Sequence, residues 1–210
     1  MSQQGRFVVV EGIDGAGTTT QVAKLAARLR KDGHLVRSTR EPSDGPIGSM
    51  IRQVLTGRVV SPEGAPGWAT MALLFAADRM DHVEAEIVPF VKSGGVVISD
   101  RYDASSLAYQ SVTSGAGAKQ AVEWIRTLNA HAVRPDLTIV LDLNADVAAA
   151  RREERGEAAQ LYEQNEVQRA LAEFYRDLPK HMPTDRIVVV DAAGTVDEVH
   201  ARVYEAYSRP

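Results

Sequence analysis

The residues with the clearest chemical potential follow directly on the first apolar run of the chain. Gly12 and Gly17 are five positions apart, and Thr18, Thr19 and Thr20 come next. This spacing matches the phosphate-binding loop G-x-x-x-x-G-K-[ST], with Thr19 at the hydroxyl position that helps to coordinate Mg²⁺. Glycines are needed there because backbone N–H groups must curl closely around phosphate oxygens. The loop therefore predicts a nucleotide-phosphate site at the positive end of the following helix.

One charged residue of that pattern is absent. The motif has Lys where this chain has Thr18, and a hydroxyl group supplies no positive charge. Phosphoryl transfer depends mostly on positioning and charge stabilisation, so the loss of this cation would lower the rate unless another cation replaces it. For the loop taken alone, a glycine-rich turn that binds nothing is the alternative interpretation.

Further charged and aromatic residues occur in four segments, at 39–42, 74–79, 100–110 and 134–138. Phe75 and Arg79 are four residues apart and project from one face of a helix, where a ring can stack on a base and Arg can donate to a carbonyl oxygen. Asp100 and Arg101 end a predicted strand, and ligands of open parallel sheets bind at the carboxyl ends of strands. The alternatives are a core Phe beside a surface Arg, and an Arg–Asp pair that caps the strand.

Together with the loop, these segments resemble bacterial thymidylate kinases, P-loop nucleoside monophosphate kinases that phosphorylate dTMP from ATP. The resemblance covers about residues 6–205, and its most specific part is the run 100–110. It implies ATP and dTMP as substrates, Mg²⁺ as cofactor, and dTDP for dTTP synthesis as product. Two alternatives stay open: a related kinase with another acceptor, such as dUMP or a deoxynucleoside, and a catalytically impaired nucleotide-binding homologue in which Thr18 replaces the lysine.

The resemblance also implies roles for individual residues. The ATP-binding set is Gly12, Gly15, Ala16, Gly17, Thr18, Thr19, Thr20 and Ala192. The dTMP-binding set is Asp14, Glu41, Arg52, Phe75, Arg79, Arg101, Ser105, Ser106 and Gln110. Phe75 is expected to stack on thymine and Arg79 to contact its O4 edge. Gln110 is expected near the base, and the two serines are expected to select against a ribose 2′-hydroxyl. From the loop motif and the residue types rather than from the resemblance, Thr19 and Asp100 are the expected Mg²⁺ ligands, Asp100 through water; the alternative for Asp100 is that it orients the loop.

The catalytic set that the resemblance implies is Asp14, Arg101, Arg152 and Arg155. The last two belong to a segment at about 151–161, where thymidylate kinases close a mobile lid over the donor phosphates. In the bacterial subtype the lid supplies arginines because the loop has none, and this loop has none either. We expect Arg152 or Arg155, together with Arg101, to replace the charge that Thr18 lacks.

Composition narrows the class of protein that carries this site. The 210 residues include 24 Lys or Arg and 28 Asp or Glu, which gives a formal net charge of −4. A mildly acidic chain is a poor candidate for binding nucleic acid or an anionic membrane surface. The absence of Cys excludes disulfides and thiolate metal sites. With no apolar run near 18 residues and no signal sequence, we expect a cytoplasmic protein.

The elements that must position these residues follow from apolar patterning. Short β-branched runs at 7–10, 35–38, 96–98, 137–141 and 187–190 alternate with helical patterns at 18–32, 46–56, 66–93, 103–111, 119–131, 145–155, 162–182 and 195–207. This alternation predicts an α/β fold, a five-stranded parallel sheet flanked by helices on both faces. We expect one P-loop kinase domain over 1–210 with a mobile lid. The apolar helix near 68–75 is a candidate for the contact of the homodimer that the resemblance implies, and packing in the core of a single chain is the alternative.

Overall fold

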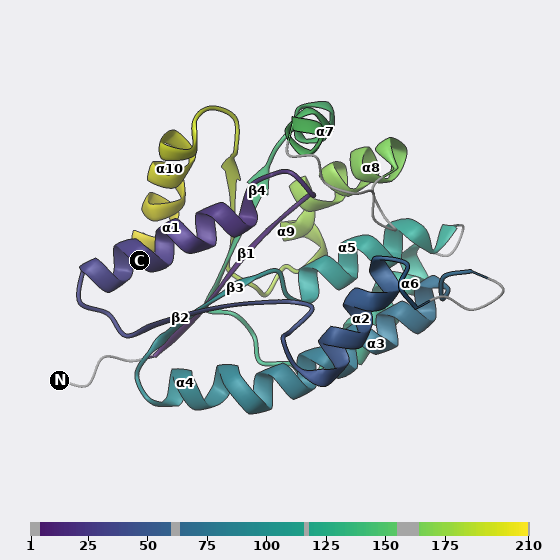
Figure 1. Cartoon of the computed structure of the whole chain (residues 1–210), viewed down its shortest axis with the longest axis horizontal. Helices are drawn as coiled ribbons and strands as arrows, with labels where there is room; N and C mark the ends of the chain where they lie inside the picture. The colour runs from purple at the N-terminus through teal and green to yellow at the C-terminus, as the bar shows by residue number, and fades with distance from the viewer. Residues whose placement is uncertain (1–4, 60–63, 116–117, 155–163, 210) are drawn as a thin grey trace.

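The computed structural model describes residues 5–59, 64–115, 118–154 and 164–209. Parallel strands form its central sheet in the spatial order β2-β3-β1-β4-β5 (Figure 1). The strands are β1 (Arg6–Gly12), β2 (Val36–Arg40), β3 (Val96–Asp100), β4 (Leu137–Asp142) and β5 (Ile187–Asp191). The five-stranded parallel sheet is therefore confirmed, and each strand begins within one residue of its predicted start.

β1 is the central strand of the sheet, and both of its faces are shielded from water. Val8, Val9 and Val10 are fully buried, and alternate side chains of a strand point to opposite faces. Val9 belongs to a core cluster with Val83, whereas Val8 and Val10 belong to another cluster with Leu25. A continuous apolar run in a strand therefore requires helices over both faces of the sheet.

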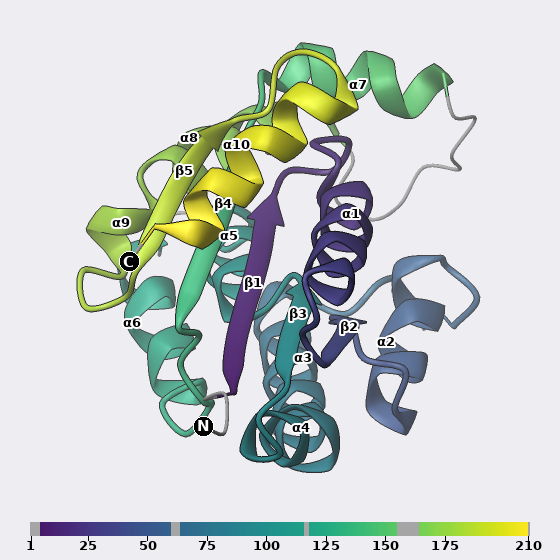
Figure 2. The same ribbon diagram turned by 90° about the vertical axis from the view of Figure 1, so that its left-hand side faces the viewer.

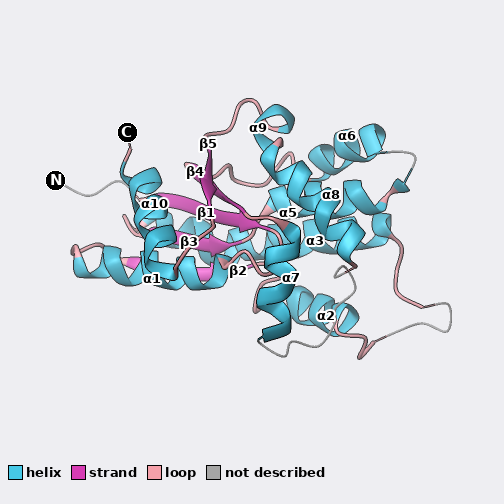
Figure 3. Ribbon diagram, turned by 90° about the horizontal axis from the view of Figure 1, so that it is seen from above, coloured by secondary structure: helices cyan, strands magenta, loops and turns pink. Residues whose placement is uncertain are grey.

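Helices cover both faces of the sheet, as predicted (Figures 1 and 2). On one face α1 (Thr18–Lys31) packs beside α10 (Val196–Ser208). On the other face lie α3 (Trp68–His82), α4 (Val88–Lys92), α5 (Asp103–Thr113) and α6 (Ala118–Leu128), with α2 (Pro46–Leu55) packed against α3. The chain also forms α7 (Ala145–Glu154), α8 (Asn165–Arg176) and the short α9 (Leu178–His181). α7 and α8 lie at the end of the sheet toward which the strands point (Figures 2 and 3).

Two segments that the patterning predicted as single helices are interrupted. The predicted helix 66–93 contains a π-helical turn, Val83–Ile87, between α3 and α4. It precedes Pro89, which has no N–H to donate to the carbonyl four residues before it. The predicted helix 162–182 breaks between α8 and α9, and the first turn of α9 holds Pro179. Proline is tolerated in the first turn of a helix, so each proline marks a new start.

The predicted lid at 151–161 is described only in part. Residues 151–154 form the last turn of α7, and residues 155–161 lie outside the described ranges. Among the described residues, no helix combines the length and the apolar character that crossing a membrane requires.

Candidate active site

The glycine-rich loop between β1 and α1 is shaped by close backbone approaches. Gly15 has a φ of 94°, and a Cβ atom there would lie 2.4 Å from the carbonyl oxygen of Ala148 in α7. Gly17 is the N-cap of α1 with a φ of 97°, and no side chain caps this helix end. The positive end of α1 is therefore left for an anion, as the phosphate-binding motif requires.

Thr19 and Asp100 meet beside the loop. The Thr19 hydroxyl donates to Oδ2 of Asp100 at 2.5 Å, while Oδ1 of Asp100 is buried without a hydrogen-bond partner. A carboxylate and a hydroxyl suit Mg²⁺, which keeps several waters and takes its other ligands from substrate phosphates. No cluster of three or more metal-ligating side chains occurs in the described part of the chain. The two residues thus fit a Mg²⁺ ion that arrives with a nucleotide.

Arg101 spans the space between the loop and the first turn of α5. It is the one non-glycine residue with a positive φ, 73°, within the described ranges. Its Nη1 donates to the carbonyl oxygen of Gly12 and its Nη2 to Oδ1 of Asp14, both at 2.6 Å. A backbone conformation of this kind costs about 1–3 kcal/mol and persists where the surrounding structure enforces it. The guanidinium is therefore held against the loop.

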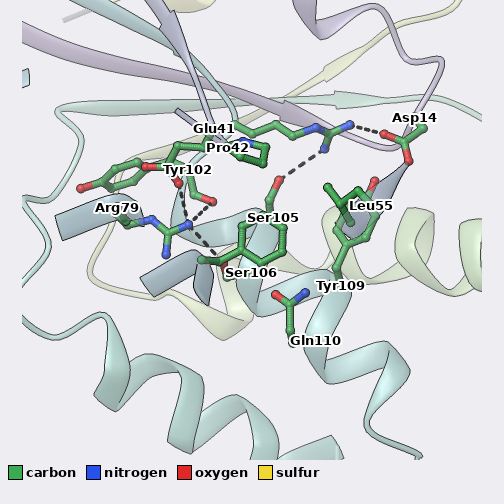
Figure 4. A pocket seen from close by; sticks show the side chains of 12 residues that line it. Asp14, Glu41, Pro42, Leu55, Arg79, Tyr102, Ser105, Ser106, Tyr109 and Gln110 are labelled. Carbon is green, nitrogen blue, oxygen red and sulfur yellow. Dashed lines mark hydrogen bonds and ion pairs between the residues drawn. The ribbon is translucent and has the colours of Figure 1, made fainter. Parts of the chain in front are cut away.

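A cavity of about 140 Å³ opens beside Arg101 (Figure 4). It is lined by Asp14, Glu41, Pro42, Leu55, Phe75, Arg79, Arg101, Tyr102, Ser105, Ser106, Tyr109 and Gln110. The structure thus brings together all of the predicted dTMP-binding residues except Arg52. They come from the β1–α1 loop, the segment after β2, α3, the turn between β3 and α5, and α5 itself. Their positions in the sequence span almost a hundred residues.

Gln110 has an unusual position at one end of this cavity. Its side chain is fully buried, yet neither Oε1 nor Nε2 has a hydrogen-bond partner. A buried amide without partners is costly, at roughly 1–3 kcal/mol for each unsatisfied group. The amide offers one acceptor and one donor side by side, so it is suited to a ligand edge that carries both.

The side chain of Arg79 is buried and hydrogen-bonded within the protein, which its helical spacing from Phe75 did not predict. Its side chain is 1% exposed and donates through Nη2 to Oε2 of Glu41 at 2.6 Å, to the Tyr102 carbonyl and to the Ser106 hydroxyl. Nη1 donates to Asn129, and Nε is buried without a partner. Arg79 is therefore not a surface residue. Its guanidinium is also not fully available to a ligand, because most of its N–H donors bind groups within the protein.

The two serines of α5 line the cavity with hydroxyl groups that are already engaged. Ser106 Oγ accepts from Arg79 at 3.1 Å, and Ser105 Oγ donates to Oε2 of Glu11 at 2.6 Å. Ser105 thus uses its hydrogen within the protein, whereas the hydrogen bond of Ser106 uses only a lone pair of its oxygen.

A second cavity, of about 330 Å³, lies on the other side of the loop. Its lining comprises Gly15, Ala16, Gly17, Thr20, Gln21, Arg151, Glu154, Gly194, Thr195, Val196 and Val199. Four of the predicted ATP-binding residues are among them; Gly12, Thr18, Thr19 and Ala192 are not. Arg151, which was not predicted, donates to the carbonyl oxygens of Ala192 and Gly194 and so ties α7 to the segment after β5.

The cations expected to replace the missing lysine have different surroundings. Arg152 is buried and donates through Nη1 to the carbonyl oxygen of Asp14 in the loop. Arg155 lies outside the described residues. Lys24 is a weaker candidate because it lies farther along α1 and away from the loop, and it is paired with Asp197 at 2.7 Å. Arg152 is thus the lid-segment arginine that the structure places against the loop.

Arg52 does not line the cavity of about 140 Å³. Its Nη1 donates to the carbonyl oxygens of Pro42 at 2.7 Å and Ser43 at 2.5 Å, and its Nη2 donates to Ser49. Arg52 therefore fixes the turn after Glu41, one wall of the cavity, in this structure.

Several residues at the site were assigned no role from the sequence. Pro42, Leu55, Tyr102 and Tyr109 line the cavity of about 140 Å³, and three of them lie within the segments 39–42 and 100–110. Gln168 of α8 donates to Oδ2 of Asp14 at 3.2 Å, across 154 positions of sequence. For Tyr102 the adjacent Arg101 is an indirect signal, whereas no local pattern pairs Gln168 with the loop.

Comparison with known proteins places this geometry in a family. The sequence model described as Thymidylate kinase matches residues 10–203. A probable thymidylate kinase of Pyrococcus abyssi (strain GE5 / Orsay) is 39% identical, over 94% of this chain and 93% of its own length. A thymidylate kinase of Cereibacter sphaeroides (strain ATCC 17029 / ATH 2.4.9) is 42% identical, over 98% and 95%. A solved structure of thymidylate kinase from Candida albicans shares the fold, with a TM-score of 0.81 at 24% identity, covering 98% of this chain and 92% of that one.

These relatives include archaeal and bacterial proteins, so the comparisons support the family rather than its bacterial branch in particular. They give no support to a kinase with a different acceptor. Because the family model and the relatives span nearly the whole chain, loop and cavities included, the chain belongs to the thymidylate kinase family.

Proposed function

We propose that this protein transfers the γ-phosphoryl group of ATP to dTMP in the cytoplasm, giving ADP and dTDP for dTTP synthesis. The choice of dTMP as acceptor rests on the family, and the buried amide of Gln110, which has no partner for either polar atom, supports a base that offers a donor beside an acceptor. The thymine edge presents an N3–H donor beside a carbonyl acceptor, and this pair satisfies both atoms of the amide.

The acceptor would occupy the cavity of about 140 Å³. Its base would stack on Phe75 and meet Gln110, with the unpartnered Nε of Arg79 available to a base carbonyl. Asp14 and Arg101, toward the loop, would contact the sugar and the phosphate, and Glu41 would complete the wall through its ion pair with Arg79. The cavity thus divides into an aromatic and amide end and a charged end, as a nucleoside monophosphate does.

The donor would bind on the other side of the loop. Backbone N–H groups from Gly12 to Thr20 would surround the phosphates, and the cavity beside Gly194 would take the remainder of ATP. Mg²⁺, held by Thr19 and Asp100, would neutralise charge on the phosphates as the phosphoryl group moves. No general base is required, because the phosphate of dTMP, with a second pKa of about 6, is mostly a dianion near neutral pH.

The charge missing at Thr18 would come from arginines, as in the bacterial subtype of the family. Arg152 donates to the Asp14 carbonyl and Arg101 to the Gly12 carbonyl, so two permanent cations flank the loop. Arg155, outside the described residues, would add a third from the lid. A closed lid at 151–161 would also exclude water, which otherwise hydrolyses ATP.

The proposal is tested by measuring ADP release from ATP and Mg²⁺ with dTMP, dUMP, dCMP, dGMP or no acceptor. We expect turnover with dTMP and little with the other nucleotides. Gln110→Leu should raise KM for dTMP about tenfold or more and leave KM for ATP unchanged, because it removes the hydrogen bonds to the base. Gln53→Leu, an exposed amide of α2, is the control and should change neither constant.

ADP release that needs no acceptor, or nucleotide binding without turnover, would contradict the proposed reaction. An unchanged KM for dTMP in Gln110→Leu would contradict the proposed orientation of the base but not the reaction itself.

A further inference from the structure

A carboxyl group that the proposed reaction does not use is buried beneath the site. Glu11, in β1, is fully buried and lines neither of the two cavities. Its Oε1 accepts from the backbone N–H groups of Tyr102 at 2.8 Å and Ser105 at 3.1 Å. Its Oε2 accepts from the hydroxyls of Ser105 at 2.6 Å and Tyr175 at 3.1 Å. A carboxylate has about four lone-pair positions, and here each has a donor.

The two hydroxyl groups connect Glu11 to Arg101. Nη1 of Arg101 lies 3.3 Å from Ser105 Oγ and 3.4 Å from the Tyr175 hydroxyl. A guanidinium can only donate, so each hydroxyl must turn a lone pair toward Arg101. It does so when its own hydrogen points to another acceptor. Ser105 donates to Glu11 Oε2 at 2.6 Å, and the Tyr175 hydroxyl lies 3.1 Å from the same oxygen and 2.9 Å from Ser105 Oγ. The direction of the hydroxyls therefore depends on the charge of Glu11.

The backbone contacts act on the same residue. Glu11 binds N–H groups directly after Arg101 and one turn further on, on the C-terminal side of the residue with a φ of 73°. Burial raises the pKa of Glu11 to about 7, while Arg101 and the hydrogen bonds to the carboxylate favour the charged form. The carboxylate is thus well populated at neutral pH. The polar groups that face it are Arg101, Ser105, Tyr102 N–H and, from α8, Tyr175.

We propose that Glu11 is a positioning residue for phosphoryl transfer, which holds the guanidinium of Arg101 against the phosphate loop through the hydroxyls of Ser105 and Tyr175. This inference rests on the proposed function, in which Arg101 contacts the transferred group. Glu11 itself touches neither nucleotide. Its contribution is to keep the Arg101 donors directed before substrate arrives, and such preorganisation is a large part of catalysis in sites of this type.

The test is Glu11→Gln, which keeps the shape but replaces one oxygen by a donor. The new N–H₂ group would donate to the two hydroxyls and turn their hydrogens toward Arg101, which repels them. We expect kcat to fall about tenfold while KM for ATP stays nearly constant. The decisive measurement is a double-mutant cycle with Arg101→Ala. In that background Glu11→Gln should lower kcat less than about twofold, because the residue it positions is gone.

An equal loss of kcat in both backgrounds, or an unchanged kcat in Glu11→Gln alone, would overturn the inference. A wild-type protein that shows no turnover of ATP with dTMP would instead contradict the proposed function.

A second variant serves if Glu11→Gln does not fold. Tyr175→Phe removes a single hydroxyl and keeps the buried ring, so it should lower kcat several-fold, again without an additional loss in Arg101→Ala. Asp136→Asn is the matched control: its carboxylate also accepts from a backbone N–H of β1, that of Phe7 at 2.7 Å, but at the opposite end of the strand. We expect this control to change the melting temperature and leave kcat unaltered. A loss of kcat in Asp136→Asn as large as that in Tyr175→Phe would overturn the positioning role.

Discussion

At the scale of single residues, the central chemical question is how a phosphate loop works without its lysine. Thr18 is itself buried and carries no charge, whereas Arg152 and Arg101 each donate to a loop carbonyl. A guanidinium beside the loop can take over the neutralisation of phosphate charge, because its planar fork binds phosphate oxygens in pairs.

Removal of the replacement cation should therefore reduce catalysis strongly. We expect Arg152→Ala to lower kcat about 100-fold, within the range seen when one donor to a developing charge is deleted. Thr18→Lys in the Arg152→Ala background should restore part of the rate, since it returns the cation to its usual place. Arg151→Ala is the comparison: that side chain lines the donor cavity, so its loss should act mainly on KM for ATP. Steady-state kinetics that show no effect of Arg152→Ala or of Thr18→Lys would exclude Arg152 as the substitute.

The buried Glu11 also predicts a pH dependence of stability. Burial raises its pKa from 4.5 to about 7, so between these values the folded protein keeps a proton that the unfolded chain releases. The free energy of unfolding should therefore fall as the pH rises from about 4.5 to 7, by on the order of 3 kcal/mol from this group. In Glu11→Gln that contribution is absent. Urea unfolding of the ligand-free wild type and of Glu11→Gln at pH 5 and pH 8 measures this contribution. An equal pH dependence of the unfolding free energy in the two proteins would contradict the raised pKa of Glu11.

At the scale of elements, the loop and α7 are matched by a close backbone approach. Gly15 packs against the Ala148 carbonyl with no room for a side chain, and the same helix carries Arg151 and Arg152 on its last turns. The position of the loop and the position of these arginines are therefore coupled, through this approach and through the hydrogen bond from Arg152 to the Asp14 carbonyl oxygen.

Gly15→Ala should push the phosphate loop away from α7. The substitution combines left-handed backbone strain, about 1–2 kcal/mol, with a clash against the carbonyl of Ala148. We expect a loss of about 2–4 kcal/mol in unfolding free energy and a clearly higher KM for ATP. Gly33→Ala is the matched control, because Gly33 has a similar φ of 91° but a Cβ atom there would meet no other part of the protein within 4 Å. Gly33→Ala should lose only the unfolding free energy that the backbone strain costs, and its KM for ATP should be unchanged. Equal stability losses in the two variants would mean that the close approach contributes nothing.

At the scale of the whole molecule, the remaining proposal concerns the homodimer. Trp68, at the start of α3, is packed edge-to-face on Trp124 of α6 within the same chain, with ring centroids 5.5 Å apart. Leu73 of α3 and Met50 of α2 are instead 50% and 44% exposed, and the two helices lie side by side (Figure 1). The exposed residues, rather than the tryptophans, therefore support a contact between two copies here.

Leu73→Glu should convert a dimer to a monomer, because it buries a charge in an apolar contact. Sedimentation equilibrium measures the mass of each variant. Val189→Glu, at an exposed apolar position in β5, is the control and should leave the mass unchanged. A monomeric wild-type protein, or a dimer that persists in Leu73→Glu, would contradict this interface.

The local sequence determined the parts of this protein that depend on neighbouring residues. Short β-branched runs predicted all five strands. β1, β3 and β4 are apolar and buried along their length because helices cover both of their faces, whereas the edge strands β2 and β5 are partly exposed. The glycines at 12, 15 and 17 predicted a tight phosphate loop, because only short-range backbone geometry is involved. The resemblance of the motifs from Asp14 to Gln110 to thymidylate kinases implied most of the residues that line the cavity of about 140 Å³, and the carboxyl end of β3 predicted the position of Arg101.

Only the tertiary structure decided which partners these residues have. The strand order β2-β3-β1-β4-β5 puts β3 next to β1, and this brings Arg101 to Gly12 and Tyr102 to Glu11. α8 adds Tyr175 to the same cluster from 164 positions away along the chain. Local periodicity specifies which face of an element is buried but not which element covers it. For that reason the functional residues were largely visible in the sequence, whereas the network that holds Arg101 in place was not.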